Sequence, residues 1–309
     1  MLTPEERMMI GLKVLERLRP TLRRARQEQK ARLALNNPDE DQPVDRDDPS
    51  FGQIPLLPNE DETDEADEVE AGVQEIRLQD VIHDPKRWEP GSVVIGACED
   101  GLPFVLDLNN PAPGSLLVAG DAGSGKTRLL QSILTSTVLL NPPSQVSFTI
   151  LGNFPEEYTG LGEAANCQNL IATEDEGASD AVMAFAAAVE QRRRSTPRGP
   201  AMILVIDNLA SLAQSINSHA LEQLYGLVRH GPRARIWVIA ALPTEQLDWV
   251  DDRLLAAFRT HLLGSIVSPW QAERLGADEQ AAVENLQPGT QFCAPFADNW
   301  MRFWICSPD

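Results

Sequence analysis

Eight residues near the middle of the chain have the types and spacing needed to bind a polyphosphate. They read GDAGSGKT over 120–127 and match the pattern G-x-x-x-x-G-K-[ST] at every fixed position. Glycines at 120, 123 and 125 let the backbone curl so that its N–H groups point at an anion. Lys126 supplies a cation for the β- and γ-phosphates, and Thr127 supplies a hydroxyl for Mg²⁺.

The setting of this segment supports the same chemistry, because a strand-like run precedes it and a helix-like run follows it. We therefore expect ATP and Mg²⁺ as cofactors. The predicted nucleotide-binding residues are Gly120, Asp121, Ala122, Gly123, Ser124, Gly125, Lys126, Thr127 and Arg128.

An acidic residue at the end of an apolar run supplies the second part of the predicted site. Residues 202–206 read MILVI, and Asp207 follows them directly. An apolar strand that ends in an acid is the usual form of the strand that holds Mg²⁺ in such sites. We expect Thr127 and Asp207 to bind the metal, directly or through water.

The next residue, Asn208, leaves ATP hydrolysis an open question. In many motor ATPases a glutamate follows the metal-binding aspartate and polarises the attacking water, whereas an asparagine amide has no carboxylate to accept a proton. The candidate catalytic residues are Lys126, Asp207 and Asn208, and they are compatible with slow hydrolysis or with binding without turnover. Glu156 and Glu157, which follow an expected strand over 146–151, are an alternative source of the carboxylate.

Alternating strand-like and helix-like runs, which begin near residue 74, must position these side chains. Strands are expected over 93–97, 103–106, 116–119, 146–151, 202–206 and 236–241. Helices are expected from near residue 125 to 140, over 178–194 and over 219–229. This alternation predicts an α/β fold with a mostly parallel sheet between layers of helices.

The net charge of the 309-residue chain is −20, and it is unevenly distributed. Residues 1–36 carry +5, residues 37–75 carry −14 and residues 76–309 carry −11. The middle segment is rich in proline and acidic residues, which predicts a disordered linker, with a docking tail for a basic partner as the alternative. We expect three parts: a basic helical arm (1–36), the acidic linker (37–75) and an ATPase domain (76–309).

The arm has the pattern of an amphipathic helix. Thr3 and Pro4 are typical of a helix start, apolar side chains recur at helical spacing after them, and arginines dominate the second part. One interpretation is a solvated helix that docks on a protein partner through its apolar side. The other is an arm that binds DNA, an anionic membrane or an acidic partner.

Composition disfavours several classes of protein. No run of about 18 apolar residues is present, so we do not expect an integral membrane protein. Four scattered cysteines without a C-x-x-C pair fit the reducing cytoplasm. The acidic charge disfavours nucleic-acid binding over the whole surface but is compatible with a locally basic pore.

The order of these segments resembles the FtsK/HerA family of RecA-like motor ATPases over roughly 91–309. The similar segments lie at 101–108, 113–127, 148–151, 158–161, 189–194, 229–241, 276–277 and 288–290. Three polar positions depart from the family pattern. Asp207-Asn208 stands where Asp-Glu is common, Leu242 stands near a common Thr-Gln pair, and residues 151–153 read LGN in place of Asp-Pro-Lys.

The resemblance implies a RecA-like P-loop fold and a hexameric ring of identical chains that couples Mg-ATP binding and hydrolysis to DNA translocation. Double-stranded DNA would pass through a central pore, and an arginine of a neighbouring chain would reach the γ-phosphate. The candidates for this arginine are Arg229, Arg233, Arg235 and Arg259. The altered polar positions favour an alternative, a hydrolysis-weak nucleotide-binding assembly or scaffold protein of a secretion, conjugation or defence system.

Overall fold

Ten strands form one sheet in the computed structural model, which describes residues 76–194, 199–296 and 299–308. The predicted arm (1–36) and linker (37–75) lie outside these residues. The strand order is β2-β1-β10-β9-β8-β3-β7-β6-β4-β5. The strands are β1 (Ser92–Cys98), β2 (Pro103–Asp107), β3 (Leu116–Gly120), β4 (Val146–Gly152), β5 (Cys167–Ala172), β6 (Ala201–Asp207), β7 (Ile236–Pro243), β8 (Thr260–Leu263), β9 (Gln291–Phe296) and β10 (Asn299–Trp304).

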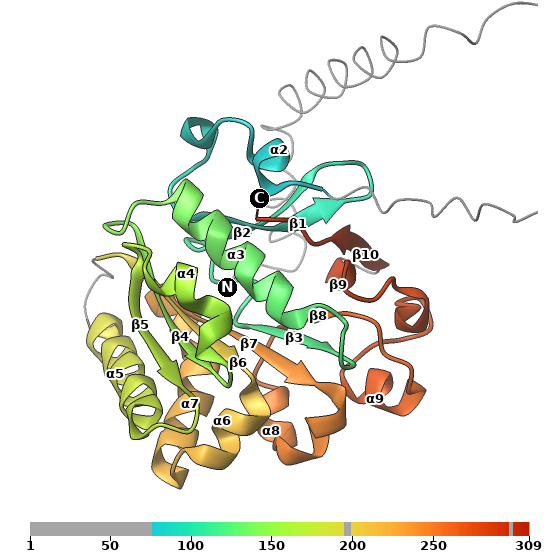
Figure 1. Ribbon diagram of the computed structural model, residues 1–309. Helices are drawn as coiled ribbons and strands as arrows, with labels where there is room; N and C mark the ends of the chain where they lie inside the picture. The colour runs from blue at the N-terminus through green and yellow to red at the C-terminus, as the bar shows by residue number, and fades with distance from the viewer. Residues whose placement is uncertain (1–75, 195–198, 297–298, 309) are drawn as a thin grey trace, which may run out of the picture. The chain divides into compact units, whose positions relative to one another are not determined.

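The α-helices connect and flank these strands (Figure 1). They are α2 (Leu78–Ile82), α3 (Lys126–Leu140), α4 (Thr159–Gly162), α5 (Glu176–Arg193), α6 (Leu209–Ser215), α7 (Ser218–His230), α8 (Asp252–Leu255) and α9 (Pro269–Arg274). Short 3₁₀ helices are η1 (Pro85–Arg87), η2 (Pro155–Tyr158), η3 (Gly231–Ala234), η4 (Thr244–Trp249) and η5 (Val283–Asn285). Within the described residues, no helix combines the length and apolar character needed to span a bilayer.

The strands β8, β3, β7, β6, β4 and β5 run parallel, so their carboxyl ends meet at one edge of the sheet. Gly120 of β3 lies opposite Pro243 of β7, and Asp207 of β6 lies opposite Ala241 of β7 and Gly152 of β4. Ligands of open α/β sheets bind beyond the carboxyl ends of the strands. The register therefore brings the glycine-rich segment and Asp207 to the same edge.

Alternating residues of the parallel strands build two cores, one on each face of the sheet. Leu116 and Val118 of β3 belong to the core under α3, whereas Leu117 and Ala119 belong to the core under α5, α6 and α7. All four side chains are fully or almost fully buried. A strand covered on both faces must be apolar at every position, which explains the uninterrupted apolar runs.

The remaining strands β9, β10, β1 and β2 extend the sheet in antiparallel fashion from β8. The strands expected over 93–97 and 103–106 are confirmed as β1 and β2, and their antiparallel pairing forms a hairpin. The α/β class and the sheet between helices are confirmed as well. The strands β5, β8, β9 and β10 have no counterpart among the predicted strands.

Candidate nucleotide-binding site

The glycine-rich segment connects β3 to α3 at the carboxyl edge of the sheet. Gly125 is the N-cap residue of α3 and lies in the left-handed region with φ of 94°. A Cβ atom at this position would lie 3.0 Å from the backbone of Gly289, which belongs to a distant part of the chain. Both the backbone conformation and this close approach require glycine at 125.

The side chain of Lys126 folds back over the loop. Its Nζ donates hydrogen bonds to the carbonyl oxygens of Gly120 at 2.9 Å and Asp121 at 2.8 Å. Burial lowers the pKa of Lys126, and the carboxylates of Glu245, Asp207 and Asp121 act in the opposite direction. An ammonium group is thus placed on the loop that the sequence predicts to bind phosphates. Arg128, the remaining basic residue of the predicted set, lies half-buried in the first turn of α3.

The carboxylate of Asp207 accepts hydrogen bonds from two hydroxyl groups. Thr127 Oγ1 donates to Asp207 Oδ2 at 2.7 Å, and the hydroxyl of Tyr158 donates to the same oxygen at 2.8 Å. Burial, followed by the charge of Asp207, raises the pKa of Tyr158, so this residue stays a hydroxyl donor. The structure therefore brings together the two predicted metal ligands and adds Tyr158, which sequence analysis missed.

The pair formed by Thr127 and Asp207 suits Mg²⁺, which takes hard oxygen ligands and usually combines one or two carboxylates with substrate phosphates and water. Within the described ranges, no group of three or more His, Cys, Asp and Glu side chains is arranged to hold a metal ion. A metal at this pair would need nucleotide phosphates to complete its ligands. The donor set thus fits Mg²⁺ bound together with ATP.

The amide of Asn208 has a structural role at the start of α6. Its Oδ1 accepts a hydrogen bond from the backbone N–H of Ser211 at 2.8 Å, which caps the helix. Asn153 at the end of β4 also contacts this turn, donating from Nδ2 to Ser211 Oγ at 2.7 Å. Two of the polar positions that depart from the family pattern therefore stabilise the connection after β6.

Leu242, another departing position, is fully buried in the core under α5, α6 and α7. Polar residues follow it immediately, in η4. Glu245 Oε1 accepts a hydrogen bond from the backbone N–H of Ala122 at 2.8 Å, and Thr244 Oγ1 donates to the carboxylate of Asp121. The segment after β7 thus contacts the loop through residues that sequence analysis missed.

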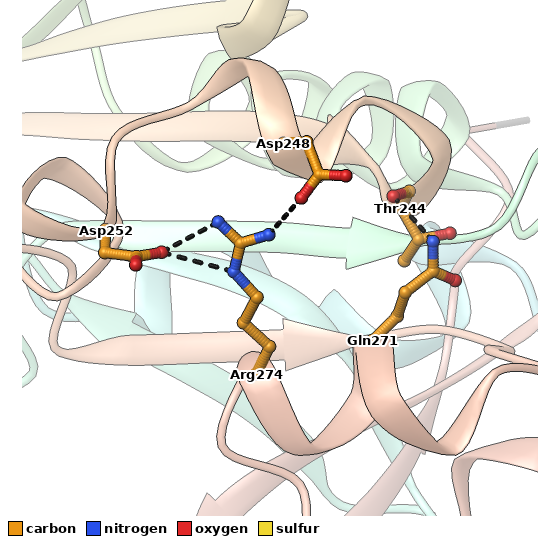
Figure 2. Close-up of polar contacts among 5 residues, drawn as sticks. All are labelled: Thr244, Asp248, Asp252, Gln271 and Arg274. Carbon is orange, nitrogen blue, oxygen red and sulfur yellow. Dashed lines mark hydrogen bonds and ion pairs between the residues drawn. The ribbon is translucent and has the colours of Figure 1, made fainter.

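Contacts from α9 support η4 (Figure 2). Gln271 Nε2 donates to the carbonyl oxygen of Thr244 at 3.0 Å. Arg274 pairs with Asp248 of η4 at 2.5 Å and with Asp252 of α8 at 2.8 Å. The Arg274 side chain is only 22% exposed, and its contacts connect α9 to η4 and α8.

Glu156 and Glu157, the alternative carboxylates, lie exposed in η2. Burial raises the pKa of Glu157 most, and the charges of Asp207 and Glu156 raise it further. The backbone carbonyl of Glu157 also accepts a hydrogen bond from Gln131 Nε2 at 2.8 Å. Glu157 is therefore located beside Asp207 and the helix α3.

The four candidate arginines lie away from the loop. Arg229, Arg233 and Arg235 precede β7, and Arg259 precedes β8, so all four are at the amino ends of strands that run parallel to β3. Arg229 donates to the hydroxyl of Tyr225 at 3.0 Å, and Arg235 donates to the carbonyl of residue 199 at 3.2 Å. Within one chain, the structure does not bring these arginines to the predicted nucleotide site.

Residues 77–196 match the model of the FtsK/SpoIIIE family. The match contains the complete glycine-rich loop, and the geometry above shows that loop joined to Asp207 of a RecA-like sheet. This match over residues 77–196 and the geometry of the loop together support an FtsK-family P-loop ATPase.

Two curated relatives extend the comparison. The ESX-5 secretion system protein EccC5 of Mycobacterium marinum is 26% identical over 172 residues, covering 47% of this chain and 12% of that protein. The DNA translocase FtsK of Helicobacter pylori is 24% identical over 185 residues, covering 53% of this chain and 22% of that protein. The chain therefore spans a small part of the length of either relative.

A similar fold is found in a solved structure of Thermomonospora curvata EccC, described as its ATPases 2 and 3 in complex with a signal sequence peptide. The two share a TM-score of 0.58 and 17% sequence identity, covering 75% of this chain and 43% of that one. This likeness confirms the RecA-like fold.

Proposed function

We propose that this FtsK-family domain binds Mg-ATP on the 120–127 loop and hydrolyses it to move a polymer. The contact between Thr127 Oγ1 and Asp207 Oδ2 at 2.7 Å carries this proposal. It joins the two expected Mg²⁺ ligands at the edge where the loop N–H groups and Lys126 would hold the phosphates.

Each residue of the loop has a defined part in this proposal. Backbone N–H groups from Ala122 to Thr127 would bind the phosphates, and Lys126 would leave its carbonyl partners to neutralise the β- and γ-phosphates. Thr127 and Asp207 would hold Mg²⁺ between them and the nucleotide. The bound Mg²⁺ supplies charge neutralisation on the phosphate oxygens during phosphoryl transfer.

For the moving step we propose a hexameric ring in the cytoplasm with double-stranded DNA in its central pore. The FtsK relative is named as a DNA translocase, which supports DNA as the polymer. The four arginines at the amino ends of the strands are far from the loop of their own chain, which suits a role at the loop of a neighbouring chain. The N-terminal arm is proposed to bind a protein partner.

A second function is favoured by Asn208 and Leu242. Asn208 caps α6 and Leu242 is buried, so neither residue offers a proton acceptor or a γ-phosphate sensor. Under this proposal the chain binds ATP with little turnover and acts as an assembly component. The secretion-system relative EccC5 supports a protein-secretion setting for that role.

An ATPase assay with the full chain separates the two functions. We expect phosphate release that double-stranded DNA stimulates and that Lys126→Ala abolishes. Lys86→Ala, a change at an exposed lysine in η1, is the matched control and should leave the rate unchanged. Tight ATP binding without turnover, with or without DNA, would favour the assembly function, and failure to bind ATP would contradict both.

A further inference from the structure

The carboxylate of Glu245 lies against the phosphate-binding loop although it belongs to a different segment. Because β7 and β3 are parallel neighbours with Gly120 opposite Pro243, the residues after β7 emerge beside the loop after β3. Glu245 Oε1 accepts a hydrogen bond from Ala122 N at 2.8 Å. Within the described residues, the second carboxylate oxygen accepts no hydrogen bond, and the residue is exposed to water.

The backbone that carries Glu245 is fixed by its neighbours. Thr244 Oγ1 donates to the carboxylate of Asp121. Thr244 O accepts a hydrogen bond from Gln271 Nε2 at 3.0 Å, as Figure 2 shows. Further along η4, Asp248 is paired with Arg274. These contacts hold the second residue of η4 on the loop and leave one oxygen of its side chain available.

Glu245 and Lys126 engage the same turn of the loop. Lys126 Nζ lies 2.8 Å from the carbonyl oxygen of Asp121, which shares its peptide group with Ala122 N, the donor to Glu245. In a loop of this pattern, the lysine reaches the β- and γ-phosphates. The carboxylate is therefore placed near the γ-phosphate end of a bound nucleotide.

Other polar side chains near the loop are already engaged. Both carboxylate oxygens of Asp121 accept hydrogen bonds, one from Thr244 Oγ1 and one from Val267 N at 2.8 Å. Asp207 accepts two hydroxyl hydrogen bonds and is the proposed metal ligand, and Asn208 caps α6.

We propose that Glu245 is the general base of ATP hydrolysis in this chain, an inference that rests on the proposed Mg-ATP function. Its carboxylate accepts a proton from a water molecule as the water oxygen bonds to the γ-phosphorus. The bond from the γ-phosphorus to the bridging oxygen breaks, and ADP leaves with the electron pair. Glu245 then releases the proton to phosphate or solvent, which restores the carboxylate.

The substitution Glu245→Gln removes the ability of the side chain to accept a proton but keeps its hydrogen bond to the loop. The amide oxygen of glutamine can still accept the hydrogen bond from Ala122, but the amide cannot act as a base. General base catalysis typically contributes 10²–10⁴-fold, so we expect single-turnover hydrolysis to slow by about 100-fold or more. The affinity for Mg-ATP, measured separately by calorimetry with a slowly hydrolysed analogue, should change by less than about threefold.

Glu273→Gln is the matched control, since Glu273 is an exposed glutamate of α9 whose side chain has no contact described in the structure. It should hydrolyse ATP at the wild-type rate. Glu157→Gln tests the competing carboxylate beside Asp207. Loss of hydrolysis in Glu157→Gln together with an active Glu245→Gln protein would overturn the proposal.

Two other results would also overturn it. Tighter ATP binding with unchanged hydrolysis in Glu245→Gln would mean that the carboxylate only competes with phosphate. A wild-type chain that binds Mg-ATP but never hydrolyses it would contradict the base while leaving the nucleotide site intact. Failure of the wild-type chain to bind Mg-ATP would instead reject the proposed function itself.

Discussion

At the residue scale, Asn208 stands where a catalytic glutamate is common in related ATPases, and in this chain it stabilises the start of α6. The hydrogen bond from Ser211 N to its Oδ1 satisfies one of the free N–H groups at the start of that helix. Alanine at an N-cap position removes such a bond. The cap therefore gives the Asn208 amide a structural role at the start of α6.

Asn208→Ala is expected to lower the free energy of unfolding by about 1 kcal/mol. Chemical denaturation monitored by circular dichroism measures this change. Asn217→Ala is a matched control, because Asn217 caps α7 through a hydrogen bond from Ala220 N at 2.9 Å. Similar losses in both variants would support a capping role, whereas a stable Asn208→Ala protein would contradict it.

The sequence predicts the pair of Thr127 and Asp207 because each belongs to a motif with a local signature. Tyr158 and Glu245 have no such signature. Tyr158 reaches Asp207 because β4 and β6 are paired in register, and Glu245 reaches Ala122 because β7 pairs with β3. Their contacts depend on strand order, which the spacing of residues along the chain does not specify.

At the element scale, the turn from β3 into α3 depends on the backbone at Gly125. Its φ of 94° is unfavourable for any residue with a Cβ, and the neighbouring backbone of Gly289 leaves little space. The phosphate-binding loop is therefore supported by a segment more than 150 residues away, near the end of the chain.

Gly125→Ala is expected to destabilise the chain by about 1–3 kcal/mol and to weaken ATP binding, because the loop must shift. Gly226→Ala is the control, since Gly226 lies inside α7, has no positive φ, and offers open space where an added Cβ would lie. That variant should gain about 0.5–1 kcal/mol. Equal thermal stability of the two variants would show that the loop tolerates a side chain.

The buried parallel strands were predictable because both of their faces are covered and their sequences are continuous apolar runs. The strand β5 has exposed and half-buried residues, as expected of the last strand at an edge, and its polar Gln168 and Asn169 mask the pattern. The short β8 has only four residues. Neither strand has enough apolar periodicity to be recognised without its neighbours.

At the scale of the whole molecule, the net charge of −20 does not exclude contact with DNA, because residues 37–75 contribute −14 of it. Residues 76–309 retain −11, so any contact with DNA must be confined to a locally basic surface. Such a contact would weaken steeply with salt.

The proposed ring predicts that Mg-ATP promotes assembly. Light scattering coupled to size exclusion should report a mass near the 34.0 kDa of one chain without nucleotide and a mass near six chains with Mg-ATP. Lys126→Ala should prevent the increase. A single chain under all conditions would contradict the ring.

The most direct test of the central claim is the affinity of the full chain for ATP, measured by calorimetry with and without Mg²⁺. We expect one site per chain, binding that weakens at least about tenfold without Mg²⁺, and loss of this Mg²⁺ dependence in Asp207→Asn. Lys126→Ala should abolish binding. Binding that is independent of Mg²⁺ and unaffected by Asp207→Asn would contradict a site built from the 120–127 loop, Thr127 and Asp207.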